Sequence, residues 1–406
     1  MYTILVFQLK KIIQLGKVFS KIGHRNIVTS ITSISSKEWC SIVGDKNVYL
    51  SFEYLIALEY SMKDEMDFYY SISYNENNIP SVISAFQVIT YGENRIANPT
   101  TILTKMGNCN TGLFKFNVLV CGNVFSDGEN GFLFSEGIDK KDALDEVILI
   151  SKKIKKQSKA SHRKANIVLF KEFWAKKNSY GDIFKKHKFG EFRIDVNMIL
   201  PIHEKWNSFE EYLFSLKTKY RTRAKSVYNK SKGIVVKDLT NNEIREFKSE
   251  IEILFNNVAD KSSFSFGRIK PLAFAKLKES LGDNCIFRGA FIKNKLVGFS
   301  TGLINHGILE ANYVGIDYDL NYEKAIYQRL LYDFIEKAID LNMTELHLGR
   351  TSELVKSAIG AIPENMNLYV KHNNMIHNIL MKPIFHFISP SKFELRKPFK
   401  KEYINN

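Results

Sequence analysis

A segment near the C-terminus places two bases where a strand ends and a helix begins. Its sequence, at 346–363, is LHLGRTSELVKSAIGAIP. The pattern predicts a strand that ends at Gly349 and a helix that follows at once. Arg350 would lie at the helix N-terminus, where free N–H groups favour an anion, with Lys356 just over one turn further along. We expect both bases to hold an anionic group of a substrate or donor; the alternative is that Arg350 pairs with a carboxylate of another element.

A second basic segment, at 215–232, has the sequence SLKTKYRTRAKSVYNKSK and helical spacing. Lys217 and Arg221 are four residues apart and share a helix face, as do Arg221 and Lys225. Such a face can follow phosphate groups. A solvated surface explains the run equally well, so phosphate binding by Arg221 and Lys225 is one of two interpretations.

Other kinds of chemistry lack the residues they need. The nine histidines form no pair with metal-ligand spacing, and His372 and His377 are five residues apart, which does not place them on one helical face. No Walker A, dinucleotide-binding or Gly-x-Ser-x-Gly motif occurs. We therefore expect no metal, and the sequence does not support a hydrolase or a nucleotide-binding fold.

The composition is that of a globular protein with a basic surplus. Of 406 residues, 45% are hydrophobic and 25% are charged, which excludes disorder as the main state. The 58 Lys and Arg exceed the 43 Asp and Glu by 15, and this surplus favours anionic partners. The four cysteines form no CxxC motif, and the apolar run at 2–7 is too short for a membrane span. We expect a cytoplasmic protein without an integral membrane segment.

The two halves of the chain share one order of predicted elements: helices, antiparallel strands, a long helix and a short strand. A hairpin is predicted at 68–91 and an antiparallel meander at 285–316. The matching elements are 114–125, 142–156 and 165–170 in the first half, and 307–316, 323–341 and 345–349 in the second. This order predicts an α/β fold with mixed sheets in two duplicated lobes; two unrelated α/β domains are the alternative.

The same order sets the predicted domain boundaries. A capping box at Ser208 and Glu211 opens the basic helix of the second half. The charged, irregular stretch at 173–190 reads as a linker. We predict an N-terminal segment at 1–25, a degenerate lobe at 26–172, a linker at 173–190, a lobe that carries the chemistry at 191–390 and a tail at 391–406.

Three segments of the second half resemble the GNAT acyltransferase superfamily. They are YLFSLKTKYRTRAKSVYNKSKGIVV at 212–236, the strand–loop–helix–strand at 313–349 and GRTSELVKSAIGA at 349–361. With the meander they resemble the GNAT core, and the repeated order resembles the Fem-like branch, which has two GNAT-like lobes in one chain. The resemblance implies an N-acyltransferase whose second lobe carries the reaction and whose first lobe is a structural partner.

The resemblance also implies a donor of the acyl group. GNAT enzymes that use acetyl-CoA hold its pyrophosphate on a glycine-rich turn before the long helix. Here the turn, at 315–324, is GIDYDLNYEK, which has one glycine and three acids, Asp317, Asp319 and Glu323, that would repel phosphates. Fem-like transferases instead take an aminoacyl group from tRNA, so both donors remain open.

Acyl transfer to an amine needs a base, a donor to the carbonyl oxygen and an acid for the leaving group. Glu310 and Tyr313, on the predicted central strand, are the candidate catalytic pair. Their spacing of three puts them on opposite faces of a regular strand, so they act together only if a bulge intervenes. In the alternative, Tyr313 is a core residue and Glu310 forms a salt bridge.

Three functions fit these features. The first, which we predict, is transfer of an acyl group, acetyl above all, from an acyl-CoA thioester to a small or polymeric amine. The second is a Fem-like transferase that uses aminoacyl-tRNA and acts on a cell-wall or other amine. The third is a non-catalytic protein that binds RNA or an anionic surface. Turnover separates the first two from the third, and a requirement for CoA or for charged tRNA separates the first from the second.

Overall fold

The computed structural model describes residues 22–91, 116–158, 163–177, 180–261, 267–372 and 393–403. The targeting analysis of the first residues and Cys109 lie outside these ranges. None of the described helices is long and apolar enough to cross a membrane.

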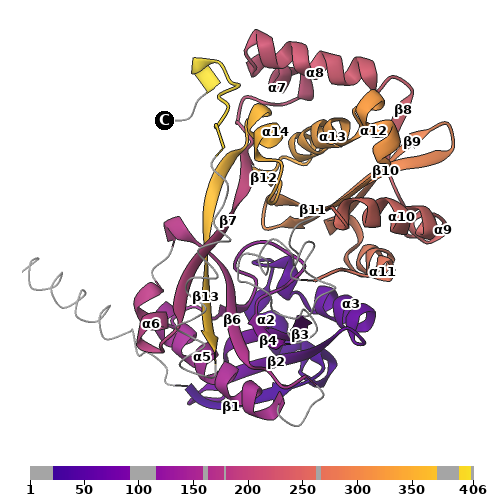
Figure 1. Cartoon of the computed structure of the whole chain (residues 1–406). Helices are drawn as coiled ribbons and strands as arrows, with labels where there is room; N and C mark the ends of the chain where they lie inside the picture. The colour runs from indigo at the N-terminus through magenta and orange to yellow at the C-terminus, as the bar shows by residue number, and fades with distance from the viewer. Residues whose placement is uncertain are drawn as a thin grey trace, which may run out of the picture.

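The first lobe is built from residues 22–186 and occupies the lower half of Figure 1. Its strands and helices are β1 (Ile22–Val28), α2 (Ser36–Val43), α3 (Phe52–Met62), β2 (Met66–Asn75), β3 (Pro80–Tyr91), β4 (Phe116–Cys121), β5 (Phe132–Phe134), α5 (Lys140–Gln157), β6 (Ile167–Trp174) and α6 (Gly181–Lys186).

The second lobe follows from residue 190 and occupies the upper half of Figure 1. Its elements are β7 (Gly190–Pro201), α7 (Phe209–Ser215), α8 (Thr218–Lys230), β8 (Ile234–Asp238), α9 (Asn241–Glu246), α10 (Lys248–Ala259), α11 (Pro271–Leu281), β9 (Cys285–Ile292), β10 (Lys295–Asn305), β11 (Ile308–Ile316), α12 (Tyr318–Lys324), α13 (Ile326–Asp340), β12 (Glu345–His347), α14 (Glu353–Ala358) and β13 (Ile362–His372).

The described strands form one continuous sheet that joins the two lobes. Its order is β1-β2-β3-β4-β6-β13-β7-β12-β11-β10-β9-β8, with β5 paired to β3. Each lobe has one parallel pair, β4 with β6 and β11 with β12. The long strands β7 and β13 run side by side between these pairs, where β13 joins β6 and β7 joins β12 (Figure 1). The predicted duplication with mixed sheets is confirmed, and the two lobes share this pair of strands.

The elements with the clearest sequence pattern form as predicted. The hairpin consists of β2 and β3, and Asn75 stabilises its turn because its side chain accepts hydrogen bonds from the backbone N–H groups of Asn77 and Ile79. The meander consists of β9, β10 and β11, and its two turns place Lys293 and Gly307 at positive φ. These strands supply the rigid frame on which the site is built.

One hydrophobic core crosses between the lobes. Helix α3 of the first lobe packs on α11 of the second, and Leu55 and Leu58 share a buried cluster with Phe274 and Leu277. Apolar side chains at helical spacing are removed from water on both sides of this contact, which is the dominant stabilising term in folding. The lobes are therefore held together by packing as well as by the shared strands.

Two predicted elements differ in the structure. The predicted helix from Ser208 through 232 is broken, because Leu216 is extended and pairs with Phe399 of the C-terminal segment. The predicted linker at 173–190 contains the end of β6 and helix α6, and its Phe184 is fully buried in the core of the first lobe. Helix α6 has both charged and buried apolar side chains, and the sequence pattern alone did not reveal its apolar side.

The C-terminal segment packs tightly on Gly360, two residues before β13 begins. Gly360 has a φ of 105°, and a Cβ atom there would overlap the ring of Phe399. We expect Gly360→Ala to lower the free energy of unfolding by about 2–4 kcal/mol, from backbone strain and overpacking together. Urea unfolding measures this. Gly137→Ala is the matched control, because Gly137 has a φ of 90° and no heavy atom within 4 Å of the added Cβ. An equal loss of unfolding free energy in both variants would contradict the packing of Phe399 on Gly360.

Candidate functional site

The central strand of the second lobe carries a bulge. Between β10 and β11 the register runs from Thr301↔Tyr313 to Gly302↔Ala311, so Asn312 is an extra residue in β11. The parallel pairing of β11 with β12 ends at Glu310, and past this point β12 leads into a chain that follows β7. The two strands therefore separate where the bulge lies.

The bulge brings Glu310 and Tyr313 to the same face of the sheet. Tyr313 lies opposite Thr301 and Glu310 lies opposite Leu303, and these two β10 residues are two apart on one face. The bulge that Glu310 and Tyr313 need in order to act together is therefore present. Both side chains point toward the first lobe, where each has a hydrogen-bond partner.

Glu310 is 7% exposed and is held by two hydrogen bonds. The hydroxyl of Tyr49 donates to its Oε2 (3.0 Å), and the amide of Asn305 donates to its Oε1 (2.7 Å). Burial raises the pKa of Glu310, while the charge of His347 and these two hydrogen bonds act in the opposite direction. A carboxyl group with a raised pKa is suited to take up a proton near neutral pH.

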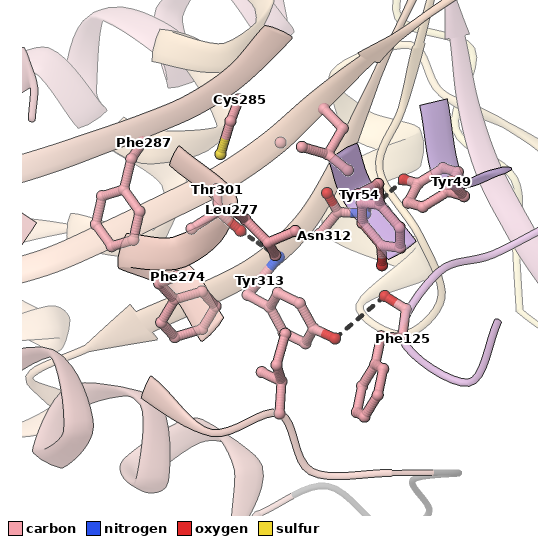
Figure 2. A pocket seen from close by; sticks show the side chains of 13 residues that line it. Tyr49, Tyr54, Phe125, Phe274, Leu277, Cys285, Phe287, Thr301, Asn312 and Tyr313 are labelled. Atoms are coloured by element: carbon pink, nitrogen blue, oxygen red, sulfur yellow. Dashed lines mark hydrogen bonds between the residues drawn. The ribbon is translucent and has the colours of Figure 1, made fainter. Parts of the chain in front are cut away.

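Burial raises the pKa of Tyr313 well above its ordinary value, so the hydroxyl is protonated at neutral pH and well above it. Its hydroxyl donates to the carbonyl of Phe125 (3.1 Å), in the first lobe. A cavity of about 20 Å³, room for one water molecule, lies against Tyr313 between the lobes (Figure 2). Its lining combines apolar side chains such as Phe274 and Phe287 with the polar groups of Tyr49, Asn312 and Thr301.

Tyr49 is a site residue that sequence reasoning missed. It is fully buried, donates to Glu310 and accepts a hydrogen bond from the bulged residue Asn312 (2.8 Å). The preceding backbone N–H, of Val48, donates to Asn305 Oδ1 (2.9 Å), which fixes this segment of the first lobe on the second. No motif surrounds Tyr49 in the sequence, so only the fold reveals it.

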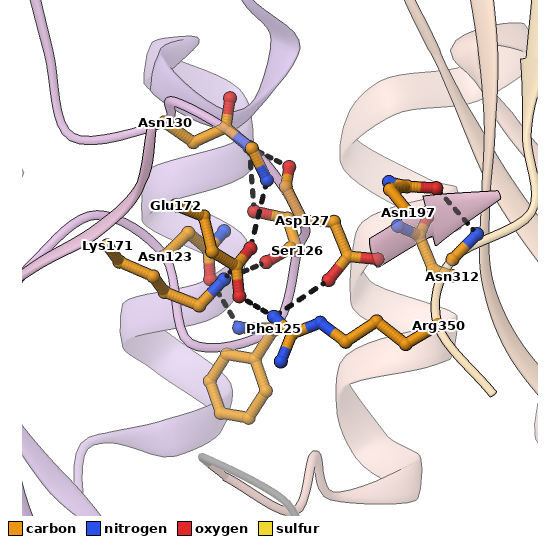
Figure 3. Close-up of polar contacts among 12 residues, drawn as sticks. Asn123, Phe125, Ser126, Asp127, Asn130, Lys171, Glu172, Asn197, Asn312 and Arg350 are labelled. Carbon is orange, nitrogen blue, oxygen red and sulfur yellow. Dashed lines mark hydrogen bonds and ion pairs between the residues drawn. The ribbon is translucent and has the colours of Figure 1, made fainter. Parts of the chain in front are cut away.

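Arg350 does not project freely from a helix N-terminus. Its guanidinium forms ion pairs with Asp127 (3.2 Å) and with Glu172, both in the first lobe (Figure 3). The following Thr351 and Ser352 have positive φ, and α14 is a short helix that begins only at Glu353. The alternative considered for Arg350, a carboxylate partner on another element, is the arrangement that the structure has.

Lys356 is 4% exposed and serves the backbone. Its ammonium donates to the carbonyl oxygens of Gly349 (3.2 Å) and Arg350 (2.5 Å). These contacts hold the chain that leaves β12, beside Asn197, whose side chain accepts from the N–H of Gly349 (3.1 Å). Lys356 thus positions the strand end, and binding of a donor by Lys356 and Arg350 stays a prediction.

The partners of Arg350 belong to a buried ionic cluster in the first lobe. Lys171 is 2% exposed, contacts Glu172 (2.5 Å) and donates to the carbonyl of Ser126 (2.5 Å). Burial and the charge of Arg350 lower the pKa of Lys171. Burial alone would raise the pKa of Asp127, but Arg350 and Lys171 pull it below its ordinary value. The signal in the sequence is a Lys-Glu pair inside the apolar strand IVLFKEFW of β6.

The basic helix α8 lies apart from this network. Its Ala224 and Val227 are buried in the core with α13, while Lys225 is exposed and Arg221 is half-buried. Arg223 lines a second small cavity, between α8, α13 and α14. The structure thus places Arg221 and Lys225 on an accessible surface of the second lobe and does not bring them to Glu310.

The turn before α13 is folded into a helix of its own, α12. Asp317 caps α12 by accepting from the N–H groups of Asp319 (3.1 Å) and Leu320 (3.4 Å). Asn321 Oδ1 accepts from the N–H of Tyr327 (2.9 Å) in the first turn of α13. A helix N-terminus binds an anion through its free backbone N–H groups. In α13 the side chain of Asn321 already accepts from one of these groups, that of Tyr327.

Within the ranges that the structure describes, no group of three or more His, Cys, Asp or Glu side chains could hold a metal ion. Two of the cysteines in the described residues are buried, Cys121 and Cys285, while Cys40 is exposed. Burial raises the pKa of Cys285 to about 12 and that of Cys121 well above its usual value. A buried thiol with a raised pKa is a poor nucleophile.

We compared the chain with known proteins by sequence and by structure. No family model and no curated protein matches the sequence. FemX is similar in structure, with a TM-score of 0.55 and 11% identity over 88% of this chain and 100% of the FemX chain. A tandem GNAT protein from the clavulanic acid biosynthesis pathway has a TM-score of 0.51 and 6% identity over 86% of this chain and 99% of that chain.

The two similarities cover 88% and 86% of this chain, so both take in residues of each lobe. The bulged strand, the separation of β11 from β12 and the repeated order agree with the GNAT resemblance of the sequence. The chain has a tandem GNAT fold of the Fem-like kind.

Proposed function

We propose that this protein is an N-acyltransferase that transfers an acyl group to an amine at the bulged end of β11. The observation that carries the proposal is the bulge at Asn312, which sets Glu310 and Tyr313 on one face beside the separation of β11 from β12. One of these groups has a raised pKa and can accept a proton, and the other stays protonated and can donate one.

In the proposed reaction the amine nitrogen forms a bond to the carbonyl carbon of the donor, and the bond from that carbon to the leaving oxygen or sulfur breaks. Glu310 takes the proton that the nitrogen loses. Tyr313 donates a proton to the leaving group, and its hydroxyl turns from the carbonyl of Phe125 to do so. When the products leave, solvent carries the proton on Glu310 back to Tyr313, which resets both groups. Asn305 and Tyr49 hold the carboxylate in place, so that little reorganisation is needed during the reaction.

For the donor, we favour an aminoacyl ester carried by RNA over acyl-CoA. Helix α12 lies where the GNAT resemblance implies a pyrophosphate-binding turn, and Asn321 already caps the first turn of α13. The acids Asp319 and Glu323 stand on the same short helix and repel phosphates. The bases of α8 offer an accessible face for an RNA backbone on the same lobe. The acceptor is an amine of the cell wall or another amine.

Loss of the α8 bases tests this donor. We expect Arg221→Ala combined with Lys225→Ala to weaken binding of charged tRNA by about tenfold or more at low salt, because two phosphate contacts and their released counterions are lost. The slope of log affinity against log salt should fall by about 1.8 for double-stranded contacts. Fluorescence anisotropy over a salt series measures both.

The matched control removes two exposed lysines elsewhere, with Lys37→Ala and Lys248→Ala. It changes the net charge equally and should leave the slope near that of the wild type. Equal weakening in both double variants would show a general charge effect. Micromolar binding of CoA, unaffected by charged tRNA, would return the donor to the thioester class.

A further inference from the structure

The C-terminal segment, residues 393–403, is fixed on the second lobe at the break between α7 and α8 (Figure 1). Backbone hydrogen bonds hold it on both sides of the break. The N–H of Lys217 donates to the carbonyl of Pro398 (2.8 Å), and the N–H of Lys400 donates to the carbonyl of Ser215 (3.0 Å). The segment is therefore part of the surface from which α8 starts.

The C-terminal segment extends the row of bases that runs along α8. Lys217 immediately precedes the helix, and Arg221 and Lys225 follow at intervals of four residues, about 6 Å apart along the helix axis. The ammonium of Lys217 donates to the carbonyl oxygen of Lys397 (2.9 Å), whose own side chain is exposed. The row thus continues from the helix onto the C-terminal segment.

The positive charge of this surface exceeds that of its acids. The C-terminal segment has four bases and two acids, and the stretch at 215–221 has three bases and no acid. Of the two acids, Glu394 pairs with Arg396 (3.2 Å) and Glu402 is exposed. Among the described residues, five lysines of this surface form no ion pair: Lys217, Lys219, Lys397, Lys400 and Lys401.

Helix stability does not explain the lysines at the start of α8. The helix dipole puts partial positive charge at this end, so cations are unfavourable there. Lys217 is the N-cap residue and makes no capping hydrogen bond with its side chain, and the first turn, which contains Lys219, has no acid. The acids of α7 lie in the first turn of that helix, at the end away from the break. A polyanion bound at the start of α8 would offset this electrostatic cost.

An exposed aromatic ring adjoins these bases. Phe214, in the last turn of α7, is 59% exposed. The ammonium of Lys400 lies 3.7 Å from the centre of its ring. Proteins that bind single-stranded nucleic acid combine such parts, because a base stacks on the aromatic ring while nearby cations contact the phosphates. A lysine alone offers only the second of these contacts.

We propose that the C-terminal segment and the start of α8 form a binding surface for the single-stranded end of an RNA. The lysines and Arg221 contact phosphates, and Phe214 stacks on a base. A row of bases matches the line of charge on an RNA backbone better than the plane of charge on a membrane. The inference deepens the function proposed above and rests on it for the identity of the RNA, because an amino acid is attached to a single-stranded end of its tRNA.

Fluorescence anisotropy tests the surface with the full chain and two labelled RNA hairpins, one with a single-stranded extension and one with a blunt end. The variant with Lys397→Gln, Lys400→Gln and Lys401→Gln removes three charges and keeps the backbone hydrogen bonds of the C-terminal segment. We expect it to bind the extended hairpin at least about tenfold more weakly at about 50 mM salt. The slope of log affinity against log salt should fall by about 2, for three lost contacts to a single strand.

The matched control removes three exposed lysines elsewhere, with Lys37→Gln, Lys141→Gln and Lys248→Gln. It changes the net charge equally and should keep the wild-type slope. Absence of RNA binding, or equal loss in the control variant, would overturn the proposal. Binding of phosphatidylserine vesicles without binding of either hairpin would also overturn it and would assign the surface to a membrane.

Phe214→Leu gives a second readout, which does not depend on charge. Leucine keeps an apolar side chain at this exposed position but cannot stack on a base, so binding of the extended hairpin should weaken by about fivefold or more. The salt slope should stay unchanged, and the blunt hairpin should bind as it does to the wild type. Equal loss for both hairpins, or no loss for either, would overturn the proposal.

The RNA surface and the transferase can fail separately, because these measurements follow binding and not turnover. RNA binding with the expected losses, but no labelled amide from any donor, would support the surface and remove the transferase. Equal rates of amide formation by the wild type and the triple lysine variant, at charged tRNA well below saturation, would remove the surface and keep the transferase.

Discussion

Replacement of Arg350 by methionine should lower the free energy of unfolding by about 3–5 kcal/mol, because removal of one partner leaves buried charges uncompensated. Glu172 is fully buried and Asp127 is three-quarters buried, and both face the guanidinium across the boundary between the lobes. Urea unfolding monitored by tryptophan fluorescence measures the loss. Arg350→Lys keeps the charge without the planar fork and should give an intermediate value.

Arg396→Met is the matched control for this prediction. Arg396 forms an exposed ion pair with Glu394 (3.2 Å), and such pairs contribute about 0–1 kcal/mol. If Arg350→Met were as stable as this control but had lost affinity for the donor, Arg350 would be a binding residue and not a link between the lobes. That result would support the donor-binding role that the sequence predicts for Arg350.

Glu310→Gln should reduce kcat/KM of the acyl transfer by about 10²–10⁴-fold, the range for loss of a general base. The fold should remain intact, because glutamine has the same shape and can keep the contact with Asn305. Steady-state kinetics on the folded variant measure this effect. Glu250→Gln, on an exposed face of α10, is the control and should leave kcat/KM unchanged.

The role of Glu310 as a base also predicts how kcat/KM depends on pH. Burial raises the pKa of Glu310, so the base form is present only above that raised value, and the acidic limb of kcat/KM should lie above the ordinary pKa of glutamate. Tyr49→Phe removes a hydrogen bond that lowers this pKa, so the limb should move further up. An acidic limb unaffected by Tyr49→Phe would exclude Glu310 as the titrating base.

The stability of the chain should respond in a matching way. A group whose pKa is raised by folding stabilises the native state below its unfolded pKa, and that contribution is lost as the pH rises through the folded value. Wild-type protein should therefore lose stability relative to Glu310→Gln as the pH rises from the unfolded pKa of Glu310 through its raised folded pKa. Thermal unfolding of both proteins across the acidic range measures the difference.

Sequence patterns predicted the elements whose stabilising contacts are local. The meander and α13 follow from alternating and helical spacing, which is why their bounds agree closely with the structure. Even the need for a bulge between Glu310 and Tyr313 could be stated in advance, since it follows from the period of a strand. The duplication was visible as a repeated order of elements.

Contacts between distant segments could not be predicted in this way. The sharing of β7 and β13 depends on strand pairing across more than 160 residues, and no local pattern records it. The same holds for Tyr49, which is 261 residues from Glu310, and for the carboxylates of Asp127 and Glu172, which form ion pairs with Arg350. The break at Leu216 likewise depends on the C-terminal segment.

The proposed transferase is tested most directly by following the acyl group itself. Wild-type protein and Glu310→Gln are incubated with a pool of tRNA charged with isotopically labelled amino acids, or with labelled acetyl-CoA, and with a mixture of amines that includes cell-wall precursors. Mass spectrometry then detects new labelled amides. We predict an amide that depends on charged tRNA, forms with wild-type protein and is reduced at least about a hundredfold with Glu310→Gln. Absence of any labelled amide from either donor, or equal yields with both proteins, would contradict acyl transfer at Glu310.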